Sequence, residues 1–294
     1  MRKLRVAHIP YLNSVPYYAG VSDSGLEMVD LHPRALGQAA AEGSIDAGLM
    51  SIADTFATPD FEPLGDLGIA LDGPAHSVLL FSAEPVQRLA GTTLGITGET
   101  STSYPLLRLL LEDCYGIRPA AYVRRTEEAA PGDSGVLLIG DAALRRAMRS
   151  GLEPGISEYS SKPFQLDSAD PFEEPFPHVL DLAAAWRAWQ GLPFVFARWM
   201  VRRDVDIDTR GELLELLSKT LEGNLRRLDR LAPEHAARAG LSEHGAFAYL
   251  MGFTYQFGSA GEASIETFRD LLESTAWWEI VPPALLRRDE RDSS

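Results

Sequence analysis

The most chemically suggestive stretch of this sequence is a run of four hydroxyl side chains, Thr-Ser-Thr-Ser, at positions 100–103. The run follows an apolar segment at residues 93–97 and precedes Pro105 and several leucines, a pattern typical of a strand, a turn and the first turn of a helix. Hydroxyls and free backbone N–H groups at a helix start can hold an anion without Lys or Arg. We expect Thr100, Ser101, Thr102 and Ser103 to bind a carboxylate or phosphate; the alternative is that they only cap the helix.

Three other short polar loops follow apolar runs in the same way. An Asn side chain in such a loop can donate and accept hydrogen bonds at once, so it suits a carboxylate or a hydroxyl. Each loop also has a purely local interpretation, because Asn, Ser and Asp commonly close turns or cap helices. The residues that we expect to bind the ligand are Asn13 and Ser14 in the first loop, Ser51 and Ile52 in the second, and Gly140 and Asp141 in the third.

Ser77 and Asp141 have open roles. Ser77 follows the turn at residues 72–75 and begins a long apolar run, so its hydroxyl faces either the ligand or the edge of a sheet. Asp141 could serve as a general base, a hydroxyl acceptor or a helix cap. A carboxylate that faces an anionic ligand would have its pKa raised, which makes a direct base role harder to assume.

The elements that must position these loops alternate along the chain. Short apolar runs at residues 4–9, 27–31, 47–49, 76–82, 93–97, 121–124, 136–139, 179–181 and 194–201 predict strands, and helical patterns separate many of them. Residues 210–231, 244–257 and 262–274 predict further helices, and residues 150–178 a long loop. This alternation is typical of an α/β fold with mixed, mostly parallel sheets. Ligands of such folds bind beyond the carboxyl ends of the strands, which is where the four polar loops lie.

We expect two lobes joined by two crossings, at the strands of residues 76–82 and 194–201. Residues 1–83 with 196–294 would form the first lobe, which includes the C-terminal helices. Residues 84–195 would form the second lobe, and the ligand would bind in the cleft between them.

Composition excludes several classes of function. The net charge of −15, from 42 acidic and 27 basic residues, argues against nucleic acid or an anionic membrane as a partner. No apolar run approaches the ~18 residues of a membrane span, and Pro10 interrupts the first apolar run too early for a signal peptide. No Gly-rich nucleotide loop and no metal-ligand spacing occur, and the single cysteine is Cys114. We therefore expect a cytoplasmic protein without a cofactor, a metal or an internal disulfide.

Taken together and in order, six segments resemble the chorismate dehydratase family of the futalosine route to menaquinone. One departure is the pair Asp54-Thr55, where the resemblance would give Glu-Tyr. The segments begin at Tyr11 (Tyr-Leu-Asn-Ser-Val-Pro-Tyr), Gly43 (Gly-Ser-Ile-Asp-Ala-Gly-Leu-Met-Ser-Ile), His76 (His-Ser-Val-Leu-Leu-Phe-Ser), Thr100 (Thr-Ser-Thr-Ser-Tyr-Pro-Leu-Leu), Leu138 (Leu-Ile-Gly-Asp-Ala-Ala-Leu) and Gly191 (Gly-Leu-Pro-Phe-Val-Phe-Ala-Arg-Trp).

The resemblance implies a two-lobed fold like that of type II periplasmic binding proteins, and the dehydration of chorismate to 3-[(1-carboxyvinyl)oxy]benzoate. The hydroxyls at positions 101–103 would then hold one substrate carboxylate, and Ser51 would contact polar groups from the opposite lobe. Asn13 would contact the reacting ring, at either the leaving hydroxyl or a carboxylate, with Ser77 as a second catalytic candidate. The base stays open, and a substrate carboxylate is one candidate.

Two alternatives share the fold. One is the related enzyme that makes 1,4-dihydroxy-6-naphthoate, and the other is a non-catalytic solute-binding or sensor protein. The loop that begins at Tyr11 favours the dehydratase over the first. The absence of a signal peptide and of a DNA-binding segment argues against the second.

Overall fold

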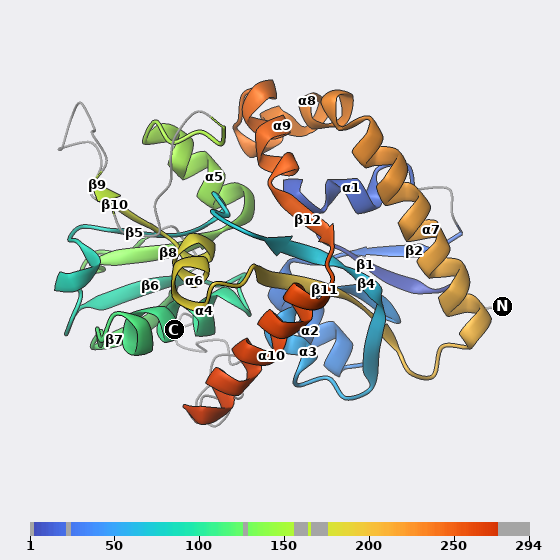
Figure 1. Cartoon of the computed structure of the whole chain (residues 1–294), viewed down its shortest axis with the longest axis horizontal. Helices are drawn as coiled ribbons and strands as arrows, with labels where there is room; N and C mark the ends of the chain where they lie inside the picture. Colours follow the sequence, from blue (N-terminus) through green and yellow to red (C-terminus); the bar gives the residue numbers. More distant parts are fainter. Residues whose placement is uncertain (1–2, 22–24, 126–128, 156–163, 166–175, 276–294) are drawn as a thin grey trace, which may run out of the picture.

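The computed structural model describes residues 3–21, 25–125, 129–155, 164–165 and 176–275. Two six-stranded sheets lie side by side, each covered by helices (Figure 1). The α/β fold with two mixed sheets is thereby confirmed. The predicted long loop at residues 150–178 and the end of the chain lie largely outside the described residues.

The first sheet is formed by strands from the N-terminal and C-terminal parts of the described chain, in the order β12-β4-β11-β3-β1-β2. Its strands are β1 (Arg5–His8), β2 (Glu27–Asp30), β3 (Ala47–Ser51), β4 (Phe61–Leu71), β11 (Phe194–Arg202) and β12 (Phe253–Gln256). The helices that lie between and after these strands in the sequence are the 3-10 turn η1 (Leu12–Ser14), α1 (Val15–Tyr18), α2 (Pro33–Ala41), α3 (Ile52–Thr55), α7 (Ile207–Arg226), α8 (Leu228–Ala239), α9 (Glu243–Met251) and α10 (Ser259–Ser274).

The second sheet is formed by the middle of the chain, in the order β7-β6-β8-β5-β10-β9. Its strands are β5 (Val78–Ser82), β6 (Thr93–Thr97), β7 (Ala121–Arg125), β8 (Gly135–Ile139), β9 (Phe164–Gln165) and β10 (His178–Asp181). The helices beside them are η2 (Val86–Arg88), α4 (Ser103–Arg108) with its π-helical continuation η3 (Leu109–Cys114), α5 (Gly140–Arg149) and α6 (Leu182–Gln190).

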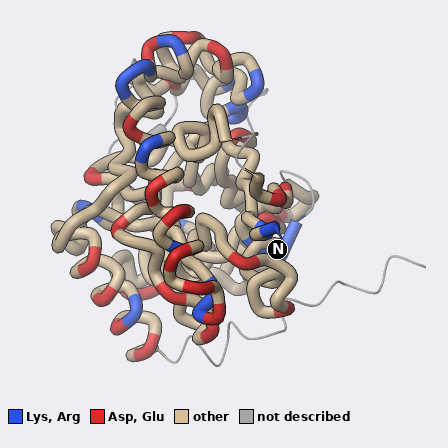
Figure 2. The backbone as a smooth tube through the Cα atoms, turned by 90° about the vertical axis from the view of Figure 1, so that its right-hand side faces the viewer, with Lys and Arg blue, Asp and Glu red and all other residues tan. Residues whose placement is uncertain are grey.

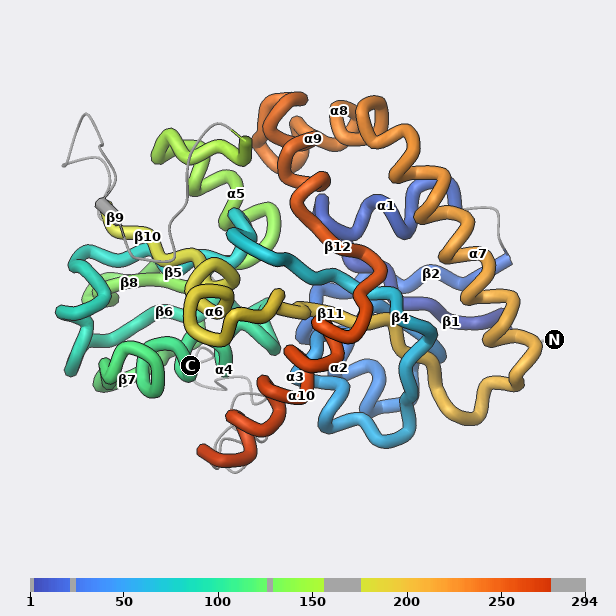
Figure 3. The backbone as a smooth tube through the Cα atoms, in the orientation of Figure 1, coloured from blue at the N-terminus to red at the C-terminus, as the bar shows by residue number. Residues whose placement is uncertain are grey.

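Antiparallel pairings are more common than the sequence predicts. Among the described strands, β1 pairs in parallel with β2 and β3, and β6 pairs in parallel with β7 and β8. The other pairings are antiparallel, so the sheets are mixed but not mostly parallel. The cause is the chain path (Figure 3). β5 and β11 are the first strands after the two changes of sheet, and each pairs antiparallel with a strand of the parallel set, β5 with β8 and β11 with β3.

The change of sheet falls in two short segments. β4 ends at Leu71 in the first sheet and β5 begins at Val78 in the second. The chain returns between α6, which ends at Gln190, and β11, which begins at Phe194. The first change of sheet therefore precedes residue 83, the boundary expected from the sequence, by the length of β5.

Two elements differ from the sequence expectations. The predicted helix at residues 244–257 ends at Met251, and Phe253 and Tyr255 then alternate buried side chains along β12, which pairs with β4. The long strand β4 has no counterpart among the predicted strands. The glycines of β4, among them Gly65 with a left-handed φ of 66°, interrupt the apolar pattern of the sequence. β4 is therefore defined by its pairing within the sheet and not by local periodicity.

An aromatic cluster packs where the chain returns to the first sheet. The Trp186 side chain on α6 is fully buried, and its ring centroid lies 5.2 Å from that of Phe194 on β11 and 5.9 Å from that of Phe268 on α10. These edge-to-face contacts join the second lobe to the C-terminal helix.

Replacing Trp186 with Ala should therefore lower the free energy of unfolding by about 3–5 kcal/mol, because it leaves a large cavity at this junction. Ile207→Ala, at a side chain that is 76% exposed, is the control and should change stability by less than about 0.5 kcal/mol. Denaturant titration followed by circular dichroism measures both. A loss at Trp186 no larger than that of the control would contradict the role of this cluster.

A cavity between the two lobes as the candidate site

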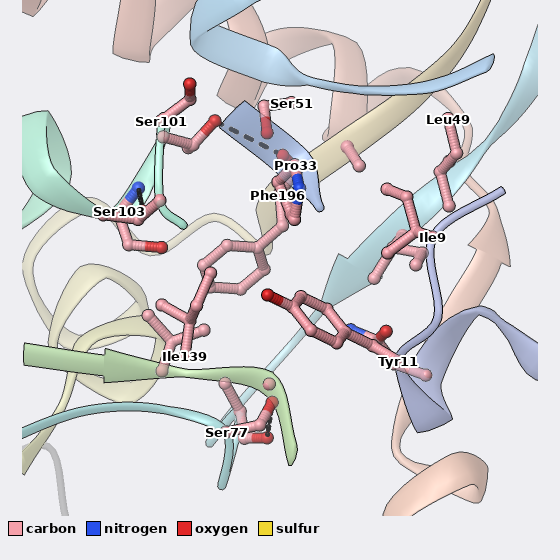
Figure 4. Close-up of a pocket in the computed structure, with 18 of the residues that line it drawn as sticks. Ile9, Tyr11, Pro33, Leu49, Ser51, Ser77, Ser101, Ser103, Ile139 and Phe196 are labelled. Atoms are coloured by element: carbon pink, nitrogen blue, oxygen red, sulfur yellow. Dashed lines mark hydrogen bonds between the residues drawn. The ribbon is translucent and has the colours of Figure 1, made fainter. Parts of the chain in front are cut away.

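A cavity lies between the two sheets. Elements from both sheets form its wall, and Figure 4 shows Ser101 and Ser103 across from Ile9 and Leu49. The predicted site residues in the wall are Asn13, Ser51, Ser77, Thr100, Ser101, Thr102, Ser103 and Gly140. Ser14, Ile52 and Asp141 are not among the lining residues.

In the first loop, Asn13 lines the cavity and Ser14 forms hydrogen bonds within the loop. Asn13 lies in η1 directly after β1 and lines the cavity. The buried Ser14 hydroxyl donates to the backbone carbonyls of Ile9 (2.5 Å) and Tyr11 (2.8 Å). Ser14 therefore shapes the turn that places Asn13.

Of the four hydroxyls at positions 100–103, two form hydrogen bonds within the protein and two face the cavity. The Thr100 hydroxyl accepts a hydrogen bond from the Ser103 backbone N–H at 3.1 Å, as a cap does. The Thr102 hydroxyl accepts from the Ala53 N–H at 3.1 Å and lies 3.4 Å from the Phe196 carbonyl, so it bridges to α3 and β11 of the first sheet. Ser101 and Ser103 remain to face the cavity (Figure 4).

Several lining side chains keep their hydrogen-bonding capacity. No hydrogen bond connects the side chains of Asn13, Ser51 or Ser103 to any described residue. Ser51 ends β3 and precedes α3, where its small side chain faces the cavity from the first sheet. These three groups are therefore available to a ligand.

At the first crossing, a buried carboxylate fixes the backbone of the two residues that precede Ser77. The Asp181 carboxylate accepts hydrogen bonds from the backbone N–H groups of Ala75 (3.0 Å) and His76 (2.8 Å), and it also caps α6. These bonds hold His76 at a left-handed φ of 57°. The Ser77 hydroxyl donates to the Ala75 carbonyl at 3.2 Å and pairs with the Tyr249 hydroxyl at 2.8 Å.

The third loop joins the lobes. Gly140 has a φ of 57°, and a Cβ there would lie 3.0 Å from the Tyr11 ring, so this position requires glycine. The buried Asp141 carboxylate accepts a hydrogen bond from the Leu12 N–H at 3.0 Å and lies 3.7 Å from Arg238. Asp141 contacts the backbone beside Asn13 rather than the cavity, so its predicted role in ligand binding has no direct support in this geometry.

Three aromatic residues line the wall, Tyr11, Phe196 and Phe253, and none of them was predicted as a site residue from the sequence. Tyr11 points its hydroxyl toward the middle of the cavity near the Phe196 ring (Figure 4). It donates a hydrogen bond to the Glu99 carboxylate of the second lobe. Burial, followed by that carboxylate, raises the pKa of Tyr11 far above its usual range, so its hydroxyl stays protonated. The available signals were an aromatic residue in a loop at a strand end and the alternation of side chains along β11.

The cavity wall is uncharged. Its described lining residues include no Lys, Arg, His, Asp or Glu. Within the described part of the chain, no cluster of His, Cys, Asp and Glu could hold a metal ion.

None of the helices described there has the length and apolar character needed to cross a membrane. Acidic and basic positions are intermixed on the side of the first lobe drawn in Figure 2.

The two lobes and the cavity between them define a protein of the periplasmic-binding-protein-like fold. Protein AF1704 from Archaeoglobus fulgidus has a similar structure, with a TM-score of 0.72 and 16% identity, and the match covers 94% of this chain and 98% of that one. The aliphatic sulphonate binding protein SsuA from Escherichia coli is also similar, with a TM-score of 0.58, 16% identity and coverage of 94% and 88%.

The chain belongs to the menaquinone biosynthesis family, whose model matches residues 4–274. It is 30% identical over 275 residues to the chorismate dehydratase of Thermus thermophilus, which covers 90% of this chain and 95% of that protein. The resemblance seen in the six sequence segments is thereby confirmed.

The Asp181 cap predicts how stability depends on pH. Burial raises the pKa of this carboxyl to about 6, and its four backbone hydrogen bonds only partly oppose that shift. The folded protein therefore binds the proton more tightly than the unfolded chain does. The contribution of Asp181 to stability should be complete below about pH 4 and should fall by up to about 3 kcal/mol as the pH rises through 6.

Denaturant titrations between pH 4 and 7.5 test this dependence. Asp181→Asn removes the titrating group and should flatten this part of the profile. The same slope in the variant would show that another group causes it.

Proposed function

We propose that this protein is a chorismate dehydratase, which removes water from chorismate to give 3-[(1-carboxyvinyl)oxy]benzoate. The observation that carries the proposal is the uncharged cavity wall. It offers hydrogen-bonding side chains from both lobes and three aromatic residues, in a chain of the menaquinone biosynthesis family. The dehydratase relative, similar over nearly the whole chain, supports the same assignment.

Chorismate matches the cavity in its chemical groups. It carries two carboxylates, a six-membered ring and a hydroxyl. Ser101 and Ser103, with backbone N–H groups at the start of α4, would hold one carboxylate, and Ser51 would contact polar groups from the first lobe. The ring would pack beside Tyr11 and Phe196.

The reaction needs little from the protein beyond position and polarity. One ring carbon loses a proton and its neighbour loses hydroxide. The electrons of the C–H bond form the new double bond, and the ring becomes aromatic as water leaves. Asn13 would donate a hydrogen bond to the departing hydroxyl or to a carboxylate, with Ser77 placed nearby by Asp181. Fixed dipoles of this kind stabilise developing charge without reorganisation.

A substrate carboxylate is the proton acceptor that fits this wall best. The described lining holds no carboxylate, imidazole or amine, and Tyr11 stays protonated. A carboxylate on the substrate itself would lie close to the reacting carbon. We propose that the protein orients this group rather than supplying a base.

Contacts across the cavity support closure over the substrate. The bonds between Tyr11 and Glu99 and between Ala53 and Thr102 join the two lobes. Closure of this kind excludes water from the reaction. Action in the cytoplasm, without cofactor, nucleic acid or membrane, remains a prediction.

The proposal predicts that purified protein converts chorismate to an aromatic product, followed by ultraviolet absorbance and mass spectrometry. Asn13→Ala and Ser103→Ala should each lower kcat/KM by about 10²-fold, because each removes a preorganised donor. Ser274→Ala, an exposed serine at the end of α10, is the matched control and should leave kcat/KM unchanged. Absence of turnover in the wild type, or near-normal kinetics in both site variants, would overturn the proposal.

A further inference from the structure

Tyr249 on α9 brings the C-terminal part of the chain to the cavity wall. Its hydroxyl lies 2.8 Å from that of Ser77, which lines the cavity directly before β5 (Figure 4). The Tyr249 ring also packs edge-to-face on Phe253, another lining residue, with the ring centroids 4.9 Å apart. Tyr249 and Ser77 are each only 2% exposed, so water does not compete for the hydrogen bond between their hydroxyls.

The direction of this hydrogen bond follows from the surroundings of Tyr249. Among the described residues, Ser77 is the only hydrogen-bond partner of the Tyr249 hydroxyl. Burial raises the pKa of Tyr249 far above its usual range, so the hydroxyl stays protonated. A buried O–H without an acceptor costs free energy. Tyr249 therefore donates, and the Ser77 oxygen accepts.

The Ser77 hydroxyl still has its own proton to offer. A serine hydroxyl has one O–H and two lone pairs. Tyr249 occupies one lone pair, and the O–H points to the Ala75 carbonyl at 3.2 Å, which is long for a hydrogen bond between a hydroxyl and an oxygen. An oxygen that gains negative charge in the cavity is a better acceptor than this carbonyl. The Ser77 O–H is therefore free to turn from Ala75 toward such an oxygen.

The backbone of Ser77 is held without any contribution from Tyr249. The Ser77 carbonyl accepts a hydrogen bond from the Gly140 N–H at 2.8 Å, and the Asp181 carboxylate fixes the two residues before Ser77. Loss of the Tyr249 hydroxyl would thus leave this backbone in place and change only the surroundings of the Ser77 side-chain oxygen.

We propose that Tyr249 is a positioning residue for Ser77: it fixes the Ser77 oxygen in the wall and strengthens the Ser77 O–H as a donor to the hydroxyl that leaves the substrate. A hydroxyl that accepts a hydrogen bond becomes a stronger donor to the next group in the chain. The inference rests on the proposed function, since it takes chorismate as the substrate. Tyr249 and Ser77 keep their protons. The electrons of the C–O bond leave with the oxygen, and the hydroxide combines with the proton lost by the ring carbon to form water.

The first arm of the test removes the Tyr249 hydroxyl. Tyr249→Phe should lower kcat for chorismate by about three- to tenfold, which corresponds to the free energy of one hydrogen bond, and should change KM much less. Tyr255→Phe is the matched control. Tyr255 is also buried, on β12, but its hydroxyl bonds to no described residue, so its loss should leave kcat unchanged.

The second arm separates this role from a purely structural one. The product, 3-[(1-carboxyvinyl)oxy]benzoate, has lost the hydroxyl that Ser77 would contact. Calorimetric titration with the product should therefore give the same Kd, within about twofold, for Tyr249→Phe and the wild type. A distorted cavity would weaken product binding together with turnover.

The third arm is a double-mutant cycle with Ser77→Ala. Because Tyr249 acts through Ser77, adding Tyr249→Phe to Ser77→Ala should lower kcat no further. The same fall in both backgrounds would show that Tyr249 acts independently of Ser77.

The two hypotheses fail differently. Absence of chorismate turnover in the wild type would overturn the proposed function and this inference with it. Turnover with an unchanged kcat in Tyr249→Phe, a parallel loss of product binding, or the same fall in the Ser77→Ala background would overturn the inference alone.

Discussion

The candidate site depends on one contact, the closure of residues 99–102 of the second lobe onto α2, α3 and Tyr11 of the first. The Glu99 carbonyl accepts from the Arg34 N–H at 3.1 Å, its carboxylate accepts from Tyr11, and the Thr102 hydroxyl accepts from the Ala53 N–H. These bonds use the polar groups that would otherwise face water and leave Ser101 and Ser103 toward the cavity. The loop thus joins the lobes and presents the ligand-binding hydroxyls at once.

The uncharged wall has to attract an anionic ligand against the charge of the whole chain. With a net charge of −15, the protein would repel a dianion at long range, so attraction has to be local. Lysine or arginine in the wall would bind the anion strongly but would also hold the substrate carboxylate that we propose as the base. Hydroxyl and amide donors bind more weakly and leave that carboxylate reactive.

Much of the fold could be predicted from the sequence because its signals are local. The strand, turn and helix around residues 93–115 follow from periodicity and capping chemistry, and the polar loops follow strand ends. The rest depends on partners far away in the chain. β4 and β12 are defined by pairing with each other, and Tyr11 is positioned by Glu99 and Gly140. The sequence predicted Asp141 as a ligand-binding residue, but its carboxylate accepts a hydrogen bond from the Leu12 backbone N–H.

The most direct test of the account is a crystal structure of the protein with 3-[(1-carboxyvinyl)oxy]benzoate bound. The ring should lie between Tyr11 and Phe196, with one carboxylate within hydrogen-bonding distance of the Ser101 and Ser103 hydroxyls and with Asn13 beside the ring. Binding outside this cavity, or inside it with both carboxylates away from Ser101 and Ser103, would contradict the central claim.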